Sequence, residues 1–203
     1  MKEHWKLLLA LTLTFSSTSC ATDGVATATK ERAIMSESNQ ITPNELGKRF
    51  LVLIKNTDGV DTLSPTVVQT SMGVTFQADE DKKSGFYTSK VPGGDWQYSM
   101  IYNLHESSSA QSSIALELIQ SNPSADASTL PCELKLGDFQ RSLVDMGFSP
   151  APTSHNEIGL VVDYSYTRRN LLVRINPYQK GAEASGEKAT GCVKRISAHR
   201  FED

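Results

Sequence analysis

The chain of 203 residues lacks any apolar run long enough to cross a lipid bilayer. A transmembrane helix needs about 20 consecutive apolar residues. The longest candidate, Leu7 to Phe15, is about half that length and is interrupted by threonines. The sequence therefore predicts no integral membrane domain.

Motifs for catalysis or metal binding are also missing. The four histidines stand far apart, and there is no Cys-x-x-Cys pair, no Gly-x-Ser-x-Gly motif and no Ser-x-x-Lys with its partner motifs. The acidic run Asp79 to Asp81 lacks the calcium-loop pattern and indicates a solvated turn. We expect no enzyme, no metal and no cofactor, although two carboxylates that meet only in space would leave no motif.

The chain lacks an excess of basic residues, with 20 lysines and arginines against 23 aspartates and glutamates. Without residues 1–19, which include Lys2, Glu3 and Lys6, these counts become 18 and 22, a net charge of −4. Proteins that bind nucleic acid present basic stripes to the phosphates. Nucleic acid is therefore not an expected partner.

Cysteine is scarce, with three residues: Cys20, Cys132 and Cys192. In an oxidising compartment the last two suggest a disulfide. Closing a loop of about 60 residues contributes roughly 4 kcal/mol in the chain-entropy model. The alternative is a pair of buried free thiols, each at the start of a strand.

The first 20 residues have the layout of a secretory signal. Lys2 and Lys6 precede the apolar run, and the small residues Ser16 to Ser19 follow it. A charged start, an apolar centre and a small-residue cleavage region are typical of a signal that is removed from the mature protein. We predict a signal peptide over residues 1–19 and export of the remainder.

Cys20, directly after this run, resembles the lipobox cysteine of bacterial lipoproteins. The usual leucine three residues earlier is Ser17 here, and ordinary cleavage after Ala21 is the alternative. The resemblance implies lipidation of Cys20, with palmitate among the acyl chains, and two or three chains anchor a protein far better than one. Because Ala21 is not the aspartate of inner-membrane retention, we expect a lipid anchor in the outer membrane, facing the periplasm.

Composition divides the remaining chain in two. Residues 20–41 are small and polar, which is typical of a flexible tether, and residues 42–203 are long enough to bury one core. Thr42 to Glu45 forms a capping box before an amphipathic helix. Ser64 and Pro65 start a second, shorter helix, which Gly73 ends.

After the second helix the apolar period changes to two, which predicts strands. We expect a short strand over 74–77, a hairpin of 86–90 with 96–103, and a strand over 114–118. The second half has a helix through 139–146, ended by Gly147, and strands over 160–166, 171–175 and 192–198. Polar loops are expected over 107–113, 121–129 and 179–191. Helices lead each half, so the predicted fold class is α+β, with helices packed on a mainly antiparallel sheet in a single domain.

The signal for partner binding is a set of aromatic and arginine residues on two of the strands. Such residues dominate the energetics of protein interfaces. The candidates are Trp96, Tyr98, Tyr102, Tyr164, Tyr166, Arg168 and Arg169. The alternative is that the aromatic faces cover the helices as core. If Tyr164 is buried in this way, Val161, Asp163 and Ser165 should face solvent.

The order helix, helix, strands over residues 42–120 resembles two small envelope folds. One is the outer-membrane assembly lipoprotein of the small protein A type. The other is the β-lactamase inhibitor protein, with its tandem helix-plus-sheet unit. The resemblance is one of element order, and a shared fold does not fix the function.

Segments Ile41 to Gly47, Leu63 to Val68 and Phe139 to Phe148 resemble the lipoprotein immunity partners of type IV and type VI secretion effectors. This resemblance implies an immunity protein that binds a secreted antibacterial effector, a peptidoglycan hydrolase or a phospholipase, and plugs its cleft. The first alternative is a structural lipoprotein for outer-membrane assembly or maintenance. The second is a binder of small ligands.

Overall fold

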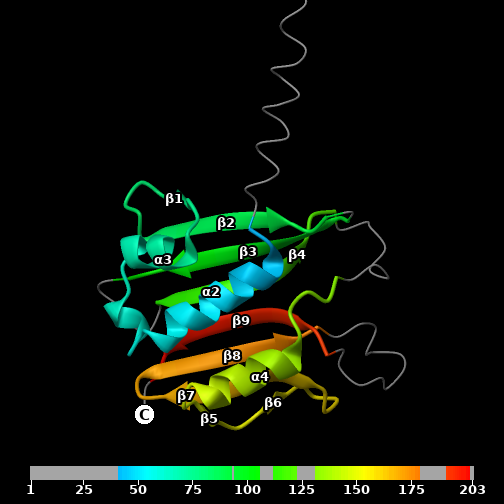
Figure 1. The fold of residues 1–203 in the computed structure, drawn as a ribbon. Helices are drawn as coiled ribbons and strands as arrows, with labels where there is room; N and C mark the ends of the chain where they lie inside the picture. The colour runs from blue at the N-terminus through cyan, green and yellow to red at the C-terminus, as the bar shows by residue number, and fades with distance from the viewer. Residues whose placement is uncertain (1–40, 93, 106–111, 123–130, 179–190, 202–203) are drawn as a thin grey trace, which may run out of the picture. The chain divides into compact units, whose positions relative to one another are not determined.

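The structure, a computed structural model, describes residues 41–92, 94–105, 112–122, 131–178 and 191–201 (Figure 1). The predicted signal peptide, Cys20 and the tether up to residue 40 lie outside these ranges, as do most of the three predicted loops. In the described part of the chain, no helix is both long and apolar enough to span a bilayer.

Helix α2 (Pro43–Lys55) begins at the predicted cap. The side chain of Thr42 accepts a hydrogen bond from the Glu45 N–H, and Pro43 occupies the first helical turn. This proline costs no hydrogen bond, because the first N–H groups of a helix have no intrahelical acceptor. The apolar side of the helix, which includes Leu46 and Phe50, is buried against the sheet.

A 3-10 turn, η1 (Val60–Thr62), leads into α3 (Pro65–Met72). The Ser64 hydroxyl accepts a hydrogen bond from the Val67 N–H and caps this helix. Gly73 ends it in the left-handed conformation, with a φ of 62°, where glycine carries no steric penalty. The predicted start and end of the second helix are confirmed.

Helix α4 (Leu136–Asp145) leads the second half. Gly147 follows with a φ of 82°, and the Phe148 N–H donates to the Leu143 carbonyl oxygen at 3.0 Å. This contact turns the Phe148 side chain back into the core, where it is 3% exposed. The predicted end of the helix is therefore confirmed.

The strands form one antiparallel sheet in the order β1-β2-β3-β4-β9-β8-β7-β5, and β6 pairs with β7 outside this path. Both ends of the path are strands of two residues. The strands are β1 (Gln77–Ala78), β2 (Ser84–Lys90), β3 (Trp96–Asn103), β4 (Ser113–Gln120), β5 (Ser149–Pro150), β6 (Ser154–His155), β7 (Val161–Arg168), β8 (Leu171–Pro177) and β9 (Val193–Arg200). The α+β prediction is confirmed, but the first strand begins at Gln77 rather than at residue 74.

The two halves meet at the centre of the sheet. Each half begins with helical structure and ends with three long strands; one short strand, β1, lies between them in the first half and two, β5 and β6, in the second. The last long strands, β4 and β9, pair with Leu116 opposite Ile196. Figure 1 shows α2 over the first half of the sheet and α4 over the second. Buried side chains from both halves form one continuous core.

Cys132 and Cys192 form a disulfide pair, with a Cα–Cα distance of 5.3 Å. This distance lies in the usual range for a disulfide, so the predicted pairing is confirmed. The bridge ties the segment before α4 to the start of β9, where Lys135 and Cys192 also form an isolated antiparallel bridge.

Candidate functional site

The aromatic residues singled out from the sequence lie on the side of the sheet that faces the helices. Trp96, Tyr98 and Tyr102 are at most 4% exposed, and Tyr166 is 7% exposed. Tyr164 is partly buried and packs against the same core. Alternation along the strands turns these positions inward, so the four buried side chains have almost no surface to offer a partner.

Asp163 corrects one expectation from the sequence. It was expected to face solvent if Tyr164 were buried, but it is 7% exposed. The short strand β6 places Ser154 opposite Asp163, and the Ser165 hydroxyl donates a hydrogen bond to the Asp163 carboxylate at 2.8 Å. These neighbours cover the carboxylate and satisfy part of its hydrogen-bonding capacity.

Arg168 joins the ends of two helices. Its guanidinium nitrogens lie 2.8–3.1 Å from four carbonyl oxygens, those of Ile54, Lys55, Thr57 and Met146. The same group lies 4.5 Å from the centre of the Phe148 ring. The last carbonyls of a helix have no intrahelical donor, so this arginine caps α2 and α4 together. Burial, and then the charge of Arg169, lower the pKa of Arg168.

Arg169 has a different environment. It adopts a left-handed backbone conformation at the turn between β7 and β8, and its guanidinium forms an exposed ion pair with Asp58. Exposed pairs of this kind contribute little stability. The two neighbouring arginines are therefore unequal: Arg168 holds the fold together, and Arg169 lies on the surface.

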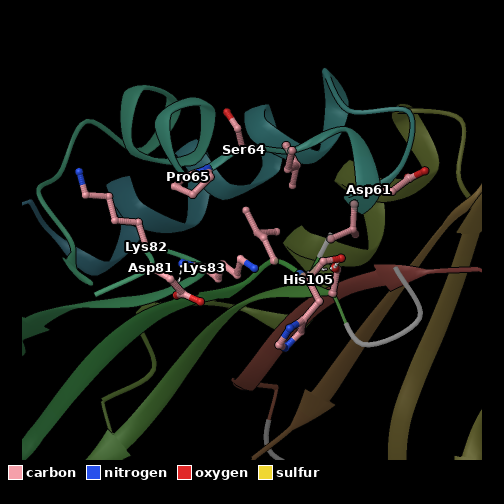
Figure 2. Close-up of a pocket in the computed structure, with 11 residues that line it drawn as sticks. Asp61, Ser64, Pro65, Asp81, Lys82, Lys83 and His105 are labelled. Atoms are coloured by element: carbon pink, nitrogen blue, oxygen red, sulfur yellow. Dashed lines mark hydrogen bonds between the residues drawn. The ribbon is translucent and has the colours of Figure 1, made fainter. Parts of the chain in front are cut away.

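A hollow of about 300 Å³ lies between η1, the start of α3 and the ends of β2 and β3 (Figure 2). Its lining includes Asp61, Asp81, Lys82, Lys83 and His105. Figure 2 shows the Lys82 and Asp61 side chains pointing away from the centre, while Lys83 points toward it. Because the charged groups are of both signs and do not converge, this hollow has no preference for one class of ligand.

The opposite face of the sheet, which no described helix covers, is the second candidate surface, and we call it the open face. Its side chains follow from the strand register, because residues opposite one another point to the same side. One row crosses the sheet through Gln77, Phe86, Ile101, Ala115, Ser197, Arg174 and Ser165. The row therefore changes from apolar residues, through small ones, to a basic residue.

An apolar hollow of about 850 Å³ occupies the open face over β1 to β4. Phe86, Ile101 and Ile119 supply its apolar side chains, and Phe86 is 44% exposed. Thr88 and Gln97 add polar groups at its lining. An exposed phenylalanine beside a hollow on an uncovered sheet is typical of a binding surface.

A basic cluster of Arg174, Arg195 and His199 lies beside the hollow on β8 and β9. Arg195 lies 3.1 Å from the Glu117 carboxylate, whereas Arg174 is exposed and has no carboxylate within 4 Å in the described ranges. Burial lowers the pKa of His199, and the charges of Arg174 and Arg195 lower it further. Both effects disfavour the charged imidazole, so the positive charge of the cluster comes from its two arginines.

The floor between the hollow and the basic cluster is made of small residues. Ser99, Ala115 and Ser197 are 2–3% exposed although they point away from the helices. Ser197 Oγ lies 2.8 Å from His199 Nε2, a contact that also occurs between a nucleophile and its base. With Ser197 3% exposed, however, its hydroxyl is hardly open to a substrate.

Within the described residues, no group of three or more histidine, cysteine or acidic side chains is arranged to hold a metal ion. No protein-family model matches the chain, and no curated protein or solved structure is similar to it at a significant level.

Sequence reasoning missed the open face because it followed the aromatic residues. The useful signal was the other half of the same strand pattern: Phe86, Ile101 and Ile119 break the polar side of strands whose opposite side is already apolar. A strand that is apolar on one side and partly apolar on the other has a second surface to cover.

Proposed function

We propose that the protein is a lipid-anchored immunity protein of the bacterial envelope that binds and neutralises a secreted antibacterial effector. The observation that carries the proposal is the open face, which joins an apolar hollow of about 850 Å³ to a basic cluster on a sheet that no described helix covers there. The signal-like N-terminus and Cys20 support export and anchoring.

The mechanism is steric. The effector docks on the open face, and the bound protein blocks the effector's active site. The effector is a peptidoglycan hydrolase or a phospholipase. A hydrogen-bonded sheet suits this role, because a preformed surface loses little conformational entropy on binding.

The genetic test compares a deletion strain with its parent in competition against cells that secrete the effector. Loss of the gene should sensitise cells only when the effector is delivered, and a copy of the gene should restore protection. Equal survival of the deletion strain and its parent under effector attack would refute the immunity role. A permeability defect without any effector would support the alternative, a structural lipoprotein of the outer membrane.

The anchor has its own test. Cys20→Ser should abolish incorporation of a labelled palmitate and release the protein from the membrane fraction, because a lipid on this cysteine would supply the anchor. Continued membrane association of the variant would contradict lipidation at Cys20 but would leave effector binding open.

A further inference from the structure

The open face combines two features that select for different groups on a partner. The apolar hollow lies over β1 to β4, and the basic cluster lies over β8 and β9. We propose that the open face recognises a protein segment that places a bulky apolar side chain in the hollow and a carboxylate against Arg174. The inference rests on the proposed binding function and defines the chemistry of the partner.

The charges on this face indicate that the partner supplies a carboxylate. Of the nearby carboxylates, Glu117 is engaged by Arg195, and Asp163 is 7% exposed with a hydrogen bond from Ser165. Arg174 is thus the exposed charge on β8 that lacks a carboxylate in the described ranges. A guanidinium binds a carboxylate through two parallel hydrogen bonds, which gives direction as well as attraction.

The strand order fixes the spacing of the two groups on the partner. Ile101 on β3 and Arg174 on β8 belong to one row and are separated by three strand-to-strand steps. At about 4.8 Å per step, the separation is about 14 Å. An extended segment advances about 3.4 Å per residue, so its apolar and acidic residues stand about four positions apart.

The floor between the hollow and Arg174 consists of small residues that their neighbours already cover, so a partner's backbone would pass over it. Ala115 and Ser197 lie in the same row between Ile101 and Arg174, and neither has a long side chain that would block the path. The partner therefore crosses the strands rather than extending the sheet.

The size of the open face suits a protein partner. Strands of about eight residues are roughly 26 Å long, and six adjacent strands span about 24 Å, which gives an area on the order of 600 Å². One side of a standard protein interface buries about 800 Å². The open face is therefore large enough to supply most of one side of such an interface.

The experiment uses three defined peptides and the isotope-labelled folded protein in nuclear magnetic resonance titrations. The first peptide is acetyl-Leu-Ser-Ser-Ser-Asp-amide; the second replaces Asp by Lys, and the third replaces Leu by Ser. The first peptide should shift amide signals near both Ile101 and Arg174. The second should bind at least fivefold more weakly, and the third should lose the shifts near Ile101.

Charge reversal supplies the matched control. Arg174→Glu should invert the preference, so that the Lys peptide binds more tightly than the Asp peptide. Arg141→Glu reverses an exposed arginine on α4, on the other side of the sheet, and should leave the preference unchanged. Far-ultraviolet circular dichroism of both variants checks that they are folded.

The proposal is overturned if the Asp and Lys peptides bind equally, if neither shifts the open-face signals at millimolar concentration, or if Arg174→Glu leaves the preference as it was. These results are independent of the competition assay. Protection that persists without peptide selectivity would refute the recognition chemistry alone. Selectivity without protection would refute the immunity role alone.

Discussion

Tyr98 places a hydroxyl in the core, and that hydroxyl makes the stability of the protein sensitive to alkali. The residue is 1% exposed, and its oxygen has no hydrogen-bond partner among the described groups. Burial, and then the charge of Glu133, raise the pKa of Tyr98 to about 12. The folded state therefore holds the phenolic proton at a pH where the unfolded chain, with a pKa near 10, has lost it.

The sign of the effect follows from linkage. Above pH 10 the unfolded state binds fewer protons than the folded state, so the free energy of unfolding falls by about 1.4 kcal/mol per pH unit up to pH 12. Tyr98→Phe should remove this loss and change stability at pH 7 by less than about 1 kcal/mol, because the hydroxyl lacks a partner. Urea unfolding at pH 7, 9 and 11 measures both effects. If the free energy of unfolding of the variant and the parent fell equally between pH 9 and pH 11, the alkaline loss would not come from Tyr98.

His199 should produce the opposite dependence at acid pH. Its pKa is lowered by burial and then by Arg174 on β8 and Arg195 on β9, while Glu117 on β4 is engaged by Arg195. The unfolded chain takes up a proton near pH 6.5, before the folded protein does. Stability therefore falls as the pH drops from 6.5 toward the folded pKa and is fully present above 6.5.

His199→Gln should flatten this part of the pH profile, because the amide does not titrate. His155→Gln is the matched control, since it makes the same substitution at an exposed histidine on β6. Urea midpoints between pH 5 and 7.5 measure the difference. A steeper profile for His199→Gln than for the parent would show that another group dominates.

The buried side chains also show which features the sequence could not predict. Alternation along the strands identified Trp96, Tyr98 and Tyr102 as one face, but a period of two does not state which face is inside. The burial of Asp163 depends on β6, which is two residues long and leaves no periodic signal. The alternation of residues along a strand shows which side chains share a face of the sheet. Only tertiary contacts determine which face is buried.

At the scale of elements, Gly47 sets how closely α2 approaches the segment that leads into α4. A Cβ at this position would lie 2.8 Å from Leu134 Cδ2 and 3.0 Å from Phe139 Cζ. Gly47→Ala should therefore destabilise the protein by about 1 kcal/mol: overpacking costs about 1–3 kcal/mol, and the better helix propensity of alanine offsets up to about 1 kcal/mol of that.

Gly137→Ala is the matched control for the change at Gly47. It lies in the first turn of α4, where the nearest atom to an added Cβ is 3.6 Å away. This substitution should leave stability unchanged or raise it by up to about 1 kcal/mol, because alanine restricts the unfolded chain. Thermal unfolding of both variants measures the contrast. A Gly47→Ala variant as stable as Gly137→Ala would show that the helices move apart freely.

A second prediction concerns Arg168, which connects α2, α4 and β7. Arg168→Met keeps the aliphatic stem but removes the guanidinium donor from four carbonyl oxygens. Each hydrogen bond from a charged group contributes about 1.5–3 kcal/mol, and water replaces part of that. We expect a loss of about 3 kcal/mol in urea unfolding, whereas Arg169→Met should change stability by less than about 1 kcal/mol. Similar losses from the two substitutions would contradict the capping role.

The helices were predictable because their signals are local. Thr42, Ser64, Gly73 and Gly147 mark helix ends through contacts within a few residues. The central pairing of β4 with β9 has no such signal, because it joins the last strand of the first half to the last strand of the second half, far apart in the sequence. For the same reason the open face, which this pairing makes continuous, could not be derived from the sequence.

At the scale of the whole molecule, the β4–β9 pairing and one continuous core make the two halves a single cooperative unit. Trp96 in the first half and the α4 helix in the second should therefore lose structure together. Tryptophan fluorescence and far-ultraviolet circular dichroism should give one urea midpoint.

The disulfide stabilises this unit by restricting the unfolded chain. Cys132 and Cys192 close a loop with a sequence separation of 60, and the chain-entropy model assigns about 4 kcal/mol to a loop of that length. Cys132→Ser with Cys192→Ser should lower the urea midpoint of both probes equally, by an amount equivalent to about 2–4 kcal/mol. Reduction of the parent protein should have the same effect, while leaving the double variant unchanged. If the two probes separate after reduction, the second half, whose ends the bridge joins, unfolds separately from the first, and the β4–β9 pairing does not make the molecule one cooperative unit.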